Sequence, residues 1–246
     1  MSKNQTVSSP SVQFNITPSD FCSQFKLVVA NTPKLQAEVY KIRYKVYCQE
    51  LGYEREEDCP NGMEQDIYDQ HSIHCLLLHR KSAVYAGSVR LVLPDPHGVG
   101  MNLPFERFYG HLHLRDLPYG SFGEISRLAV TANFRKQSKQ VESETRLFPL
   151  IPLGLYLAAI SVGQEFNLDG AFALMQPRLA RHLRRFGINY HQVGELIEFH
   201  GQRGLFHFSL QAVLSDLNPT SFNLLKALQT QVKGQLSTRD KNRQAA

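Results

Sequence analysis

Apolar residues cluster along the chain in short runs and in helical steps that follow one another in turn. Strands are predicted at the β-prone runs 25–30, 73–79, 83–93, 122–130 and 170–175, with two or three more within 188–208. Helices are predicted, from apolar steps of three and four, at 33–51, 147–166, 177–187 and 219–231, and a short one near 105–109. Polar runs at 54–61 and 131–145 predict loops. The order predicts an α/β fold with a mixed, twisted sheet and helices on both faces.

The chain ends are polar, whereas the alternation between them is continuous. Residues 1–20 are rich in Ser, Gln, Asn, Thr and Pro and are expected to be a flexible tail. One domain is expected over residues 21–215, followed by a helix and a polar tail over 216–246. Neither the dinucleotide-binding glycine pattern nor the P-loop pattern occurs, so those two nucleotide-binding folds have no support.

Composition and charge narrow the class further. The 246 residues are 42% hydrophobic and 20% charged with a net charge of +5, which excludes collagen, acidic disorder and a disulfide-stapled mini-protein. The four cysteines form no C-x-x-C pair, and reduced thiols are expected. The first twenty residues contain no apolar signal segment, and the apolar run 147–160 is too short to span a bilayer. A soluble cytoplasmic protein without a transmembrane segment is predicted, with peripheral membrane contact left open.

Polar residues concentrate in four short stretches where packing residues are expected. Arg43 and Tyr47 lie four apart on one helix, and three carboxylates follow within six residues. Carboxylates this close repel one another unless cations lie among them. Arg90 interrupts an apolar strand, and strand alternation places Glu124 and Ser126 on one face, with Ile125 and Arg127 on the other. The three carboxylates are Glu64, Asp66 and Asp69.

Less specific interpretations of these residues remain open. The arginines and carboxylates also fit a structural ion network or a solvated loop, and their spacing departs from that of a calcium loop. His111 and His113 are expected to be a surface pair, and no metal site is expected.

Together, these stretches resemble the acyl-homoserine-lactone (autoinducer) synthases, which are acyltransferases with the GNAT-like (N-acyltransferase) fold. This resemblance rests on Arg43, Tyr47, Leu51-Gly52-Tyr53, Glu64-Gln65-Asp66-Ile67-Tyr68-Asp69, Arg90-Leu91 and Glu124-Ile125-Ser126-Arg127. The second half of the chain contains Pro152-Leu153-Gly154-Leu155-Tyr156, the run 176–183 and Phe199-His200-Gly201-Gln202-Arg203. In these segments it resembles the acyltransferases associated with the PEP-CTERM/exosortase system, which are related to N-acyl amino acid synthases.

The resemblance implies transfer of a long-chain acyl group from a thioester to an amine. Tyr53 stands where the lactone synthases have Trp, and this difference favours an amino acid over S-adenosylmethionine as the amine substrate. Acetyl-CoA enzymes of this fold have glycines in the loop that holds the diphosphate, whereas residues 135–140 contain none. An acidic acyl carrier protein is therefore the expected donor partner in preference to CoA, with no bound cofactor.

The resemblance also assigns roles to individual residues. An α-amino group is mostly protonated at pH 7, and Glu124 is the expected general base, with Ser126 and Arg127 beside it. Substrate binding is expected at Arg43, Tyr47, Tyr53, Glu64, Asp66, Asp69 and Arg90, and an acyl pocket at Leu155, Phe172, Leu174 and Met175. Carrier docking is expected on Arg178, Arg181 and Arg185. The alternatives are a lactone synthase that uses S-adenosylmethionine, a non-catalytic acyl-carrier or lipid-binding module and, more distantly, a nucleic-acid binder, which is not expected.

Overall fold

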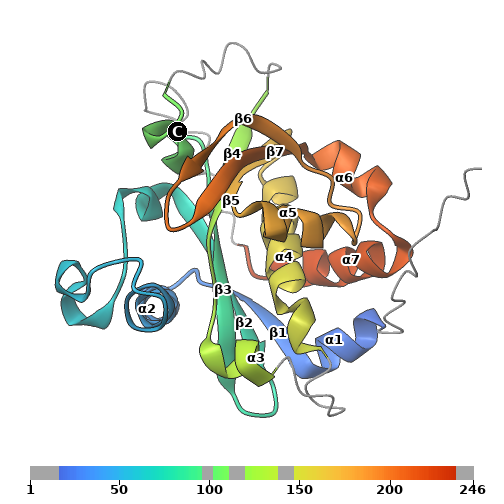
Figure 1. Ribbon diagram of the computed structural model, residues 1–246. Helices are drawn as coiled ribbons and strands as arrows, with labels where there is room; N and C mark the ends of the chain where they lie inside the picture. Colours follow the sequence, from blue (N-terminus) through green and yellow to red (C-terminus); the bar gives the residue numbers. More distant parts are fainter. Residues whose placement is uncertain (1–16, 96–101, 111–119, 138–146, 237–246) are drawn as a thin grey trace, which may run out of the picture.

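A computed structural model describes residues 17–95, 102–110, 120–137 and 147–236. These residues form one seven-stranded sheet with the order β1-β2-β3-β4-β5-β7-β6 (Figure 1). β4 and β5 run parallel, and all other neighbouring strands are antiparallel. The strands are β1 (Phe25–Val29), β2 (Ser72–His79), β3 (Val84–Val92), β4 (Phe122–Val130), β5 (Gly170–Met175), β6 (His191–Glu198) and β7 (Gln202–Ser209).

Helices cover both faces of this sheet. In Figure 1, α2 lies on one side of the strands, and α4 and α7 lie on the other. The predicted mixed sheet with helices on both faces is therefore confirmed. The helices are α1 (Pro18–Gln24), α2 (Pro33–Arg43), α3 (Ala132–Gln137), α4 (Ile151–Glu165), α5 (Pro177–Arg184), α6 (Leu210–Asp216) and α7 (Pro219–Lys233).

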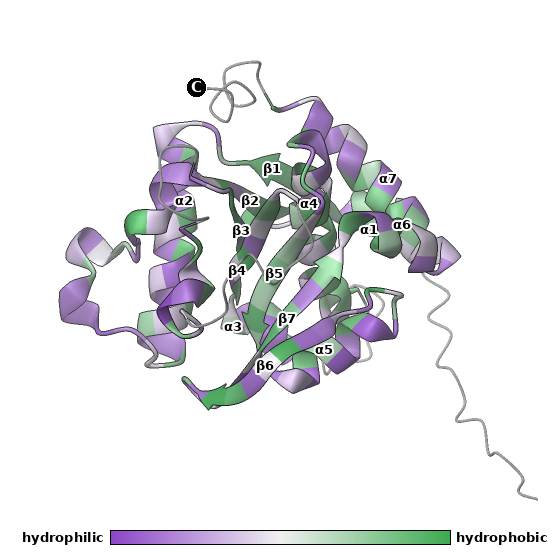
Figure 2. Cartoon of the chain, turned by 90° about the horizontal axis from the view of Figure 1, so that it is seen from above, coloured by the Kyte–Doolittle hydropathy of each residue, from purple (hydrophilic) through white to green (hydrophobic). Residues whose placement is uncertain are grey.

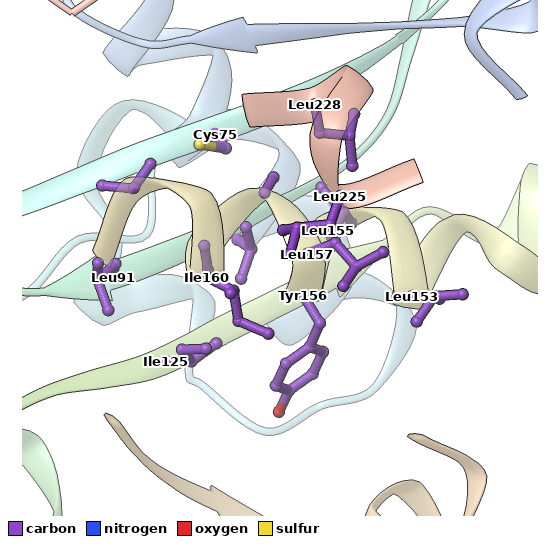
Figure 3. Close-up of a cluster of buried hydrophobic side chains, with 14 of the residues drawn as sticks. Cys75, Leu91, Ile125, Leu153, Leu155, Tyr156, Leu157, Ile160, Leu225 and Leu228 are labelled. Carbon is purple, nitrogen blue, oxygen red and sulfur yellow. The ribbon is translucent and has the colours of Figure 1, made fainter. Parts of the chain in front are cut away.

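Alternation along the strands divides the apolar side chains between two layers. Leu77 points into the large core formed with α4 and α7, whereas its neighbour Leu76 packs with Val39 and Ile42 of α2. Figure 2 shows the hydrophobic residues of the strands between the helices. Figure 3 shows the large core, where Leu155 and Leu157 of α4 lie beside Leu225 and Leu228 of α7.

Helix α4 is the centre of the large core. With the turn before it, the segment Phe148–Glu165 is long and apolar enough to cross a membrane by length and composition, yet 78% of it is buried inside the protein. Twelve of the fifteen residues of α4 are buried. Burial against the sheet and α7 accounts for this apolar composition.

Three helices lie where the sequence predicted no helix. Residues 18–20, expected in the tail, form the first turn of α1, because Thr17 and Asp20 make a capping box and Phe21 is buried in the large core. α3 lies inside the expected polar loop 131–145, and α6 precedes the last helix. α7 is part of the large core rather than an appendage, because it packs along α4.

Candidate functional site

A bulge in β4 opens the sheet next to its parallel neighbour. Ser88 pairs with Ala129 and Arg90 pairs with Ser126, so Arg127 and Leu128 together stand opposite one residue of β3. Arg127 has a φ of 50°, in the left-handed region that a non-glycine residue rarely adopts. β4 and β5 pair only as far as Glu124 and Phe172. Beyond that point, the edge of β4 that faces β5 has no strand partner among the described residues.

A cavity of about 570 Å³ lies at this opening. Its wall includes β4 from Glu124 to Leu128, the end of β5, Tyr156 of α4 and the turn between β6 and β7. The segment after α2 closes another side, through Tyr47, Tyr53 and Glu54. Because strands, helices and two connecting segments all contribute, residues far apart in the sequence meet around one partly open cavity.

Glu124 is a buried carboxyl group on the wall of this cavity, with 2% of its surface exposed. The backbone N–H of Phe105 donates a 2.7 Å hydrogen bond to Glu124 Oε2. Burial raises the pKa of Glu124 to about 8, although this hydrogen bond, Arg90 and Arg127 act in the opposite direction. A carboxyl group in this range exchanges a proton with an amine near neutral pH.

Arg43 forms the first part of a buried ion network beside the cavity. It lies where α2 passes into a π-helical segment, Tyr44–Glu50. Its Nε and Nη2 donate to the two oxygens of Glu64 at 2.5 and 3.0 Å, and its Nη1 donates to Asp69 Oδ1 at 2.7 Å. The guanidinium group is fully buried, so all of its neutralisation comes from these two carboxylates.

Arg90 joins the network from β3. Its Nη1 donates to Asp66 Oδ1 at 2.5 Å and to Asp69 Oδ1 at 2.7 Å, and its Nε donates to Ser126 Oγ at 3.1 Å. Asp66 and Asp69 also cap the 3₁₀ turn Ile67–His71 through reciprocal bonds to backbone N–H groups. The carboxylate segment is therefore fixed both by its own turn and by two arginines.

Arg127 closes the network on the cavity side. Its Nε lies 3.2 Å from Glu64 Oε1, and its Nη2 lies 3.3 Å from both Glu54 Oε1 and Asp66 Oδ2. The sequence predicted Arg127 on the face opposite Ser126, and this is wrong. The bulge interrupts the alternation of β4, so both side chains reach the same network.

The arginines control the ionisation of the three carboxylates. Burial by itself raises the pKa of Glu64, Asp66 and Asp69, but hydrogen bonds and charge from the arginines outweigh it and hold each pKa below its usual value. His74 of β2 faces this network with its Nε2 3.6 Å from Asp69 Oδ1, and burial lowers its pKa to about 3. The network is therefore ionised around a neutral imidazole at pH 7.

The structure separates the predicted site residues into two groups. Glu124, Ser126, Arg127, Tyr47, Tyr53, Glu64 and Asp66 all line the cavity, as do Leu174 and Met175. Arg43, Asp69 and Arg90 do not line it, because their charged groups form the ion network behind the wall. Direct substrate contact was predicted for these three residues, whereas the structure places them outside the cavity wall.

Two of the predicted acyl-pocket residues lie elsewhere. Leu155 is fully buried against β3, near Gly87, and Figure 3 shows it within the apolar core. Phe172 packs on Phe105 with ring centroids 4.6 Å apart and is likewise absent from the cavity wall. Leu155 and Phe172 are therefore packing residues. Arg178, Arg181 and Arg185 are exposed on and just after α5, outside the cavity.

Tyr156 is a cavity residue that the sequence analysis noted only as part of a longer motif. Figure 3 shows its ring pointing away from the leucines of α4 and α7. Its hydroxyl donates to Met175 Sδ at 3.7 Å, and burial raises its pKa above the usual value. The hydroxyl therefore already faces a sulfur atom across the cavity.

Aromatic rings close the cavity between two connecting segments. Tyr53 stacks on His200 of the β6–β7 turn with centroids 4.5 Å apart, and Phe199 of this turn packs on Phe108 at 4.6 Å. Tyr47 donates its hydroxyl to the carbonyl of Leu128 at 2.9 Å. Glu54 and Phe108 were not predicted, and His200 and Arg203 were noted only within a longer motif, because all four reach the site through contacts between distant parts of the chain.

All four cysteines are free, and one of them, Cys59, lines the cavity. Cys22, Cys48, Cys59 and Cys75 are free thiols, and Cys48 Sγ lies 3.5 Å from Cys59 Sγ. Among the described residues, no group of three His, Cys, Asp or Glu side chains is arranged to hold a metal ion. His111 and His113 lie outside the described residues.

Comparisons with known proteins identify the fold. Residues 42–141 match the family model described as "Acetyltransferase (GNAT) domain". No curated protein matches the sequence significantly. TofI in a ternary complex with an inhibitor and MTA has a TM-score of 0.56 and 19% identity, over 83% of this chain and 99% of that one.

Two further structures share the same architecture. FeeM, an N-acyl amino acid synthase from uncultured soil microbes, has a TM-score of 0.56 and 13% identity, over 79% of this chain and 94% of that one. BjaI, a CoA-dependent acyl-homoserine lactone synthase with SAM and isopentyl-CoA, has a TM-score of 0.56 and 15% identity, over 84% and 89%. The chain therefore has the GNAT fold, and the fold prediction is confirmed.

Proposed function

We propose that the protein transfers an acyl group from a carrier thioester to the α-amine of an amino acid. The observation that carries this proposal is the buried carboxyl of Glu124, with a pKa of about 8, on the wall of a cavity at the opening between β4 and β5. The GNAT domain match and the similarity to FeeM, an N-acyl amino acid synthase, support it. Association with an exosortase system and a cytoplasmic location stay predictions.

The proposed reaction uses Glu124 and Tyr156 at opposite ends of the transfer. Ionised Glu124 takes a proton from the substrate ammonium, and the nitrogen lone pair then attacks the thioester carbonyl carbon. The carbon–sulfur bond breaks and the sulfur leaves with the bonding electrons. Tyr156, whose hydroxyl already donates to a sulfur atom, supplies the proton to the leaving thiolate and regains one from the nitrogen, which loses its second proton as the amide forms. Glu124 then releases the first proton to solvent. The Ser126 hydroxyl, which accepts from Arg90, is free to donate to the oxyanion.

A carboxylate at the start of α3 favours a carrier protein over CoA as the donor. Glu50 Oε1 accepts from the backbone N–H of Ala132 at 3.0 Å, and Glu50 Oε2 pairs with Arg135. The Ala132 N–H and the Arg135 guanidinium, at the start of the glycine-free segment 135–140, therefore bind an internal carboxylate rather than a diphosphate. Residues 138–140 of that segment lie outside the described residues.

Product analysis tests the proposal directly. The purified protein is incubated with an acyl-loaded carrier protein and the twenty L-amino acids, and the products are identified by mass spectrometry. We expect an N-acyl amino acid and one free carrier thiol for each product molecule. Formation of acyl-homoserine lactone and methylthioadenosine when S-adenosylmethionine is supplied instead would favour the lactone synthase. Tight carrier binding without turnover would favour the binding module.

The exposed arginines of α5 provide a test of the carrier donor. Arg181 lies on α5 and Arg185 directly follows it, and α5 begins just after Gln176, a residue of the cavity wall. A carrier protein bound to this helix therefore has its thioester near the opening. Charge reversal (Arg181→Glu with Arg185→Glu) is expected to raise KM for the acyl carrier about tenfold or more, because it replaces attraction by repulsion.

A small thioester distinguishes docking from damage to the site. N-acetylcysteamine thioesters carry no protein, so their kcat/KM is expected to stay within twofold in the double variant. Lys226→Glu, an exposed charge reversal on α7, serves as the matched control and should leave both donors unaffected. An equal loss with both donors would show that α5 is not a docking surface.

A further inference from the structure

Arg203 is a cation on the cavity wall that forms no ion pair within the described part of the chain. Arg127, on the same wall, lies within 3.3 Å of oxygens from three carboxylates. Throughout residues 17–95, 102–110, 120–137 and 147–236, by contrast, no carboxylate forms an ion pair with Arg203. The side chain is only partly exposed, so solvent does not fully replace the missing partner.

The Arg203 side chain is held in place before any ligand arrives. Its Nε donates to the carbonyl oxygen of Phe199 at 2.6 Å. Its Cζ lies 5.8 Å from the ring centre of Tyr53 and 5.7 Å from that of Phe199. Nη1 and Nη2 have no hydrogen-bond partner among the described residues. The free end of the guanidinium group therefore presents two parallel donors, the geometry that suits a carboxylate.

Glu124 and Arg203 act on the same hydroxyl group inside the cavity. Burial is the largest cause of the raised pKa of Tyr156; beyond that, Tyr47 and the Glu124 carboxylate raise it and Arg203 lowers it. Glu124 and Arg203 both line this cavity, so a base and a cation that has no ion-pair partner among the described residues face one space. An α-amino acid carries an ammonium and a carboxylate on the same carbon, so its two charges complement this pair.

We propose that Arg203 binds the α-carboxylate of the acceptor, so that the protein selects α-amino acids and discriminates against amines that lack the carboxylate. This inference rests on the proposed function. An anionic oxygen group is the shared chemistry, and a phosphate on the acyl donor is the other source. The acceptor is favoured because Arg203 lies on the same cavity wall as Glu124, the proposed base, so that one α-amino acid can place its amine at Glu124 and its carboxylate at Arg203.

Paired acceptors test the assignment. Steady-state kinetics are measured with each of the twenty L-amino acids and with its α-carboxamide, which keeps the amine and the side chain but has no negative charge. Arg203→Met is expected to raise KM for the amino acid about 10- to 100-fold, with KM for the carboxamide and for the acyl donor within threefold of wild type. For Arg203→Lys, KM for the amino acid should lie between the values for wild type and Arg203→Met, because lysine keeps the charge without the paired donors.

A matched arginine controls for loss of charge. Arg80 also donates its Nε to a backbone carbonyl, that of Cys22 at 3.0 Å, but it lies outside the cavity wall. Arg80→Met is expected to leave every KM unchanged. An equal rise in KM for acid and carboxamide in Arg203→Met, or a rise confined to the acyl donor, would overturn the assignment.

A binding experiment distinguishes failure of the Arg203 assignment from failure of the proposed function. If wild type acylates no acceptor, calorimetric titration with the same amino acids and carboxamides still examines Arg203. Carboxylate-selective binding that Arg203→Met abolishes would support the site without the reaction. Binding of neither ligand, or equal binding of both, would overturn it.

Discussion

Glu124→Gln is expected to lower kcat for N-acylation by about 10²- to 10⁴-fold at pH 7. The amide is nearly the same size as the carboxyl and can still accept the N–H of Phe105, which lies 2.7 Å from Glu124 Oε2. It cannot take a proton from the substrate ammonium. The variant therefore removes the base with little change in shape, and stopped assays of N-acyl product over a pH series measure the effect.

The pH dependence separates loss of a base from loss of structure. Wild-type kcat/KM should rise toward pH 8 as Glu124 ionises. Above about pH 9 the amine deprotonates in solution without help. The deficit of Glu124→Gln should therefore shrink at high pH. Glu106→Gln is the matched control. Glu106 Oε1 also accepts a backbone N–H, that of Leu103 at 3.1 Å, two residues before Phe105, but Glu106 lies outside the cavity wall.

Stability gives an independent readout for the same variant. The folded-state pKa of Glu124, about 8, lies above the unfolded value of about 4.5, so its contribution to stability is present below pH 4.5 and lost as pH rises toward 8. Removing the ionisable group should raise the free energy of unfolding at pH 7, by on the order of 1–3 kcal/mol. A more stable but inactive variant excludes unfolding as the cause. Wild-type turnover at pH 7 would remove Glu124 as the base.

The periodic parts of the chain could be predicted from sequence, and the irregular parts could not. β4 and β5 have the predicted bounds, and α7 begins at Pro219 with Asn218 as its cap, as expected. α1 was missed although Thr17 and Asp20 form a capping box, because the polar composition around them favoured a tail. The β4 bulge has no signal in the apolar pattern, and it is the bulge that moves Arg127 to the other face.

In the candidate site, the spacing of charged residues along the chain predicted an ion network, whereas contacts between residues far apart in the chain could not be predicted. Three carboxylates within six residues required cations, and the structure places three arginines among them. Which of those arginines face the cavity depends on how α2, β3 and β4 pack, and no single segment encodes that. Arg203 is more than seventy residues from Glu124 in the chain, and only the β6–β7 turn brings it to the cavity wall. Tyr156 reads as one more core residue of an apolar helix.

The ion network behind the cavity is expected to dominate stability. Arg43→Met should lower the free energy of unfolding by about 3–5 kcal/mol at pH 7, because it leaves the carboxylates of Glu64 and Asp69 buried without their nearest cation. Lys41→Met, two residues earlier on α2, removes a cation whose pairing with Glu38 is exposed. That control should stay within about 0.5 kcal/mol in urea denaturation.

The expected cause of this loss of stability is the unpaired charge of the buried carboxylates rather than lost packing. Measurements at lower pH distinguish the two causes. In wild type the pKa of Glu64 and of Asp69 is lowered, so their contribution is present above about pH 4 and lost as pH falls through the folded value. Without Arg43, burial raises both pKa values, and protonation relieves the penalty at higher pH. The deficit of Arg43→Met should therefore be smaller at pH 5 than at pH 7. Adding Glu64→Gln to Arg43→Met should recover part of the loss, whereas a deficit independent of pH and unaffected by Glu64→Gln would assign the effect to packing.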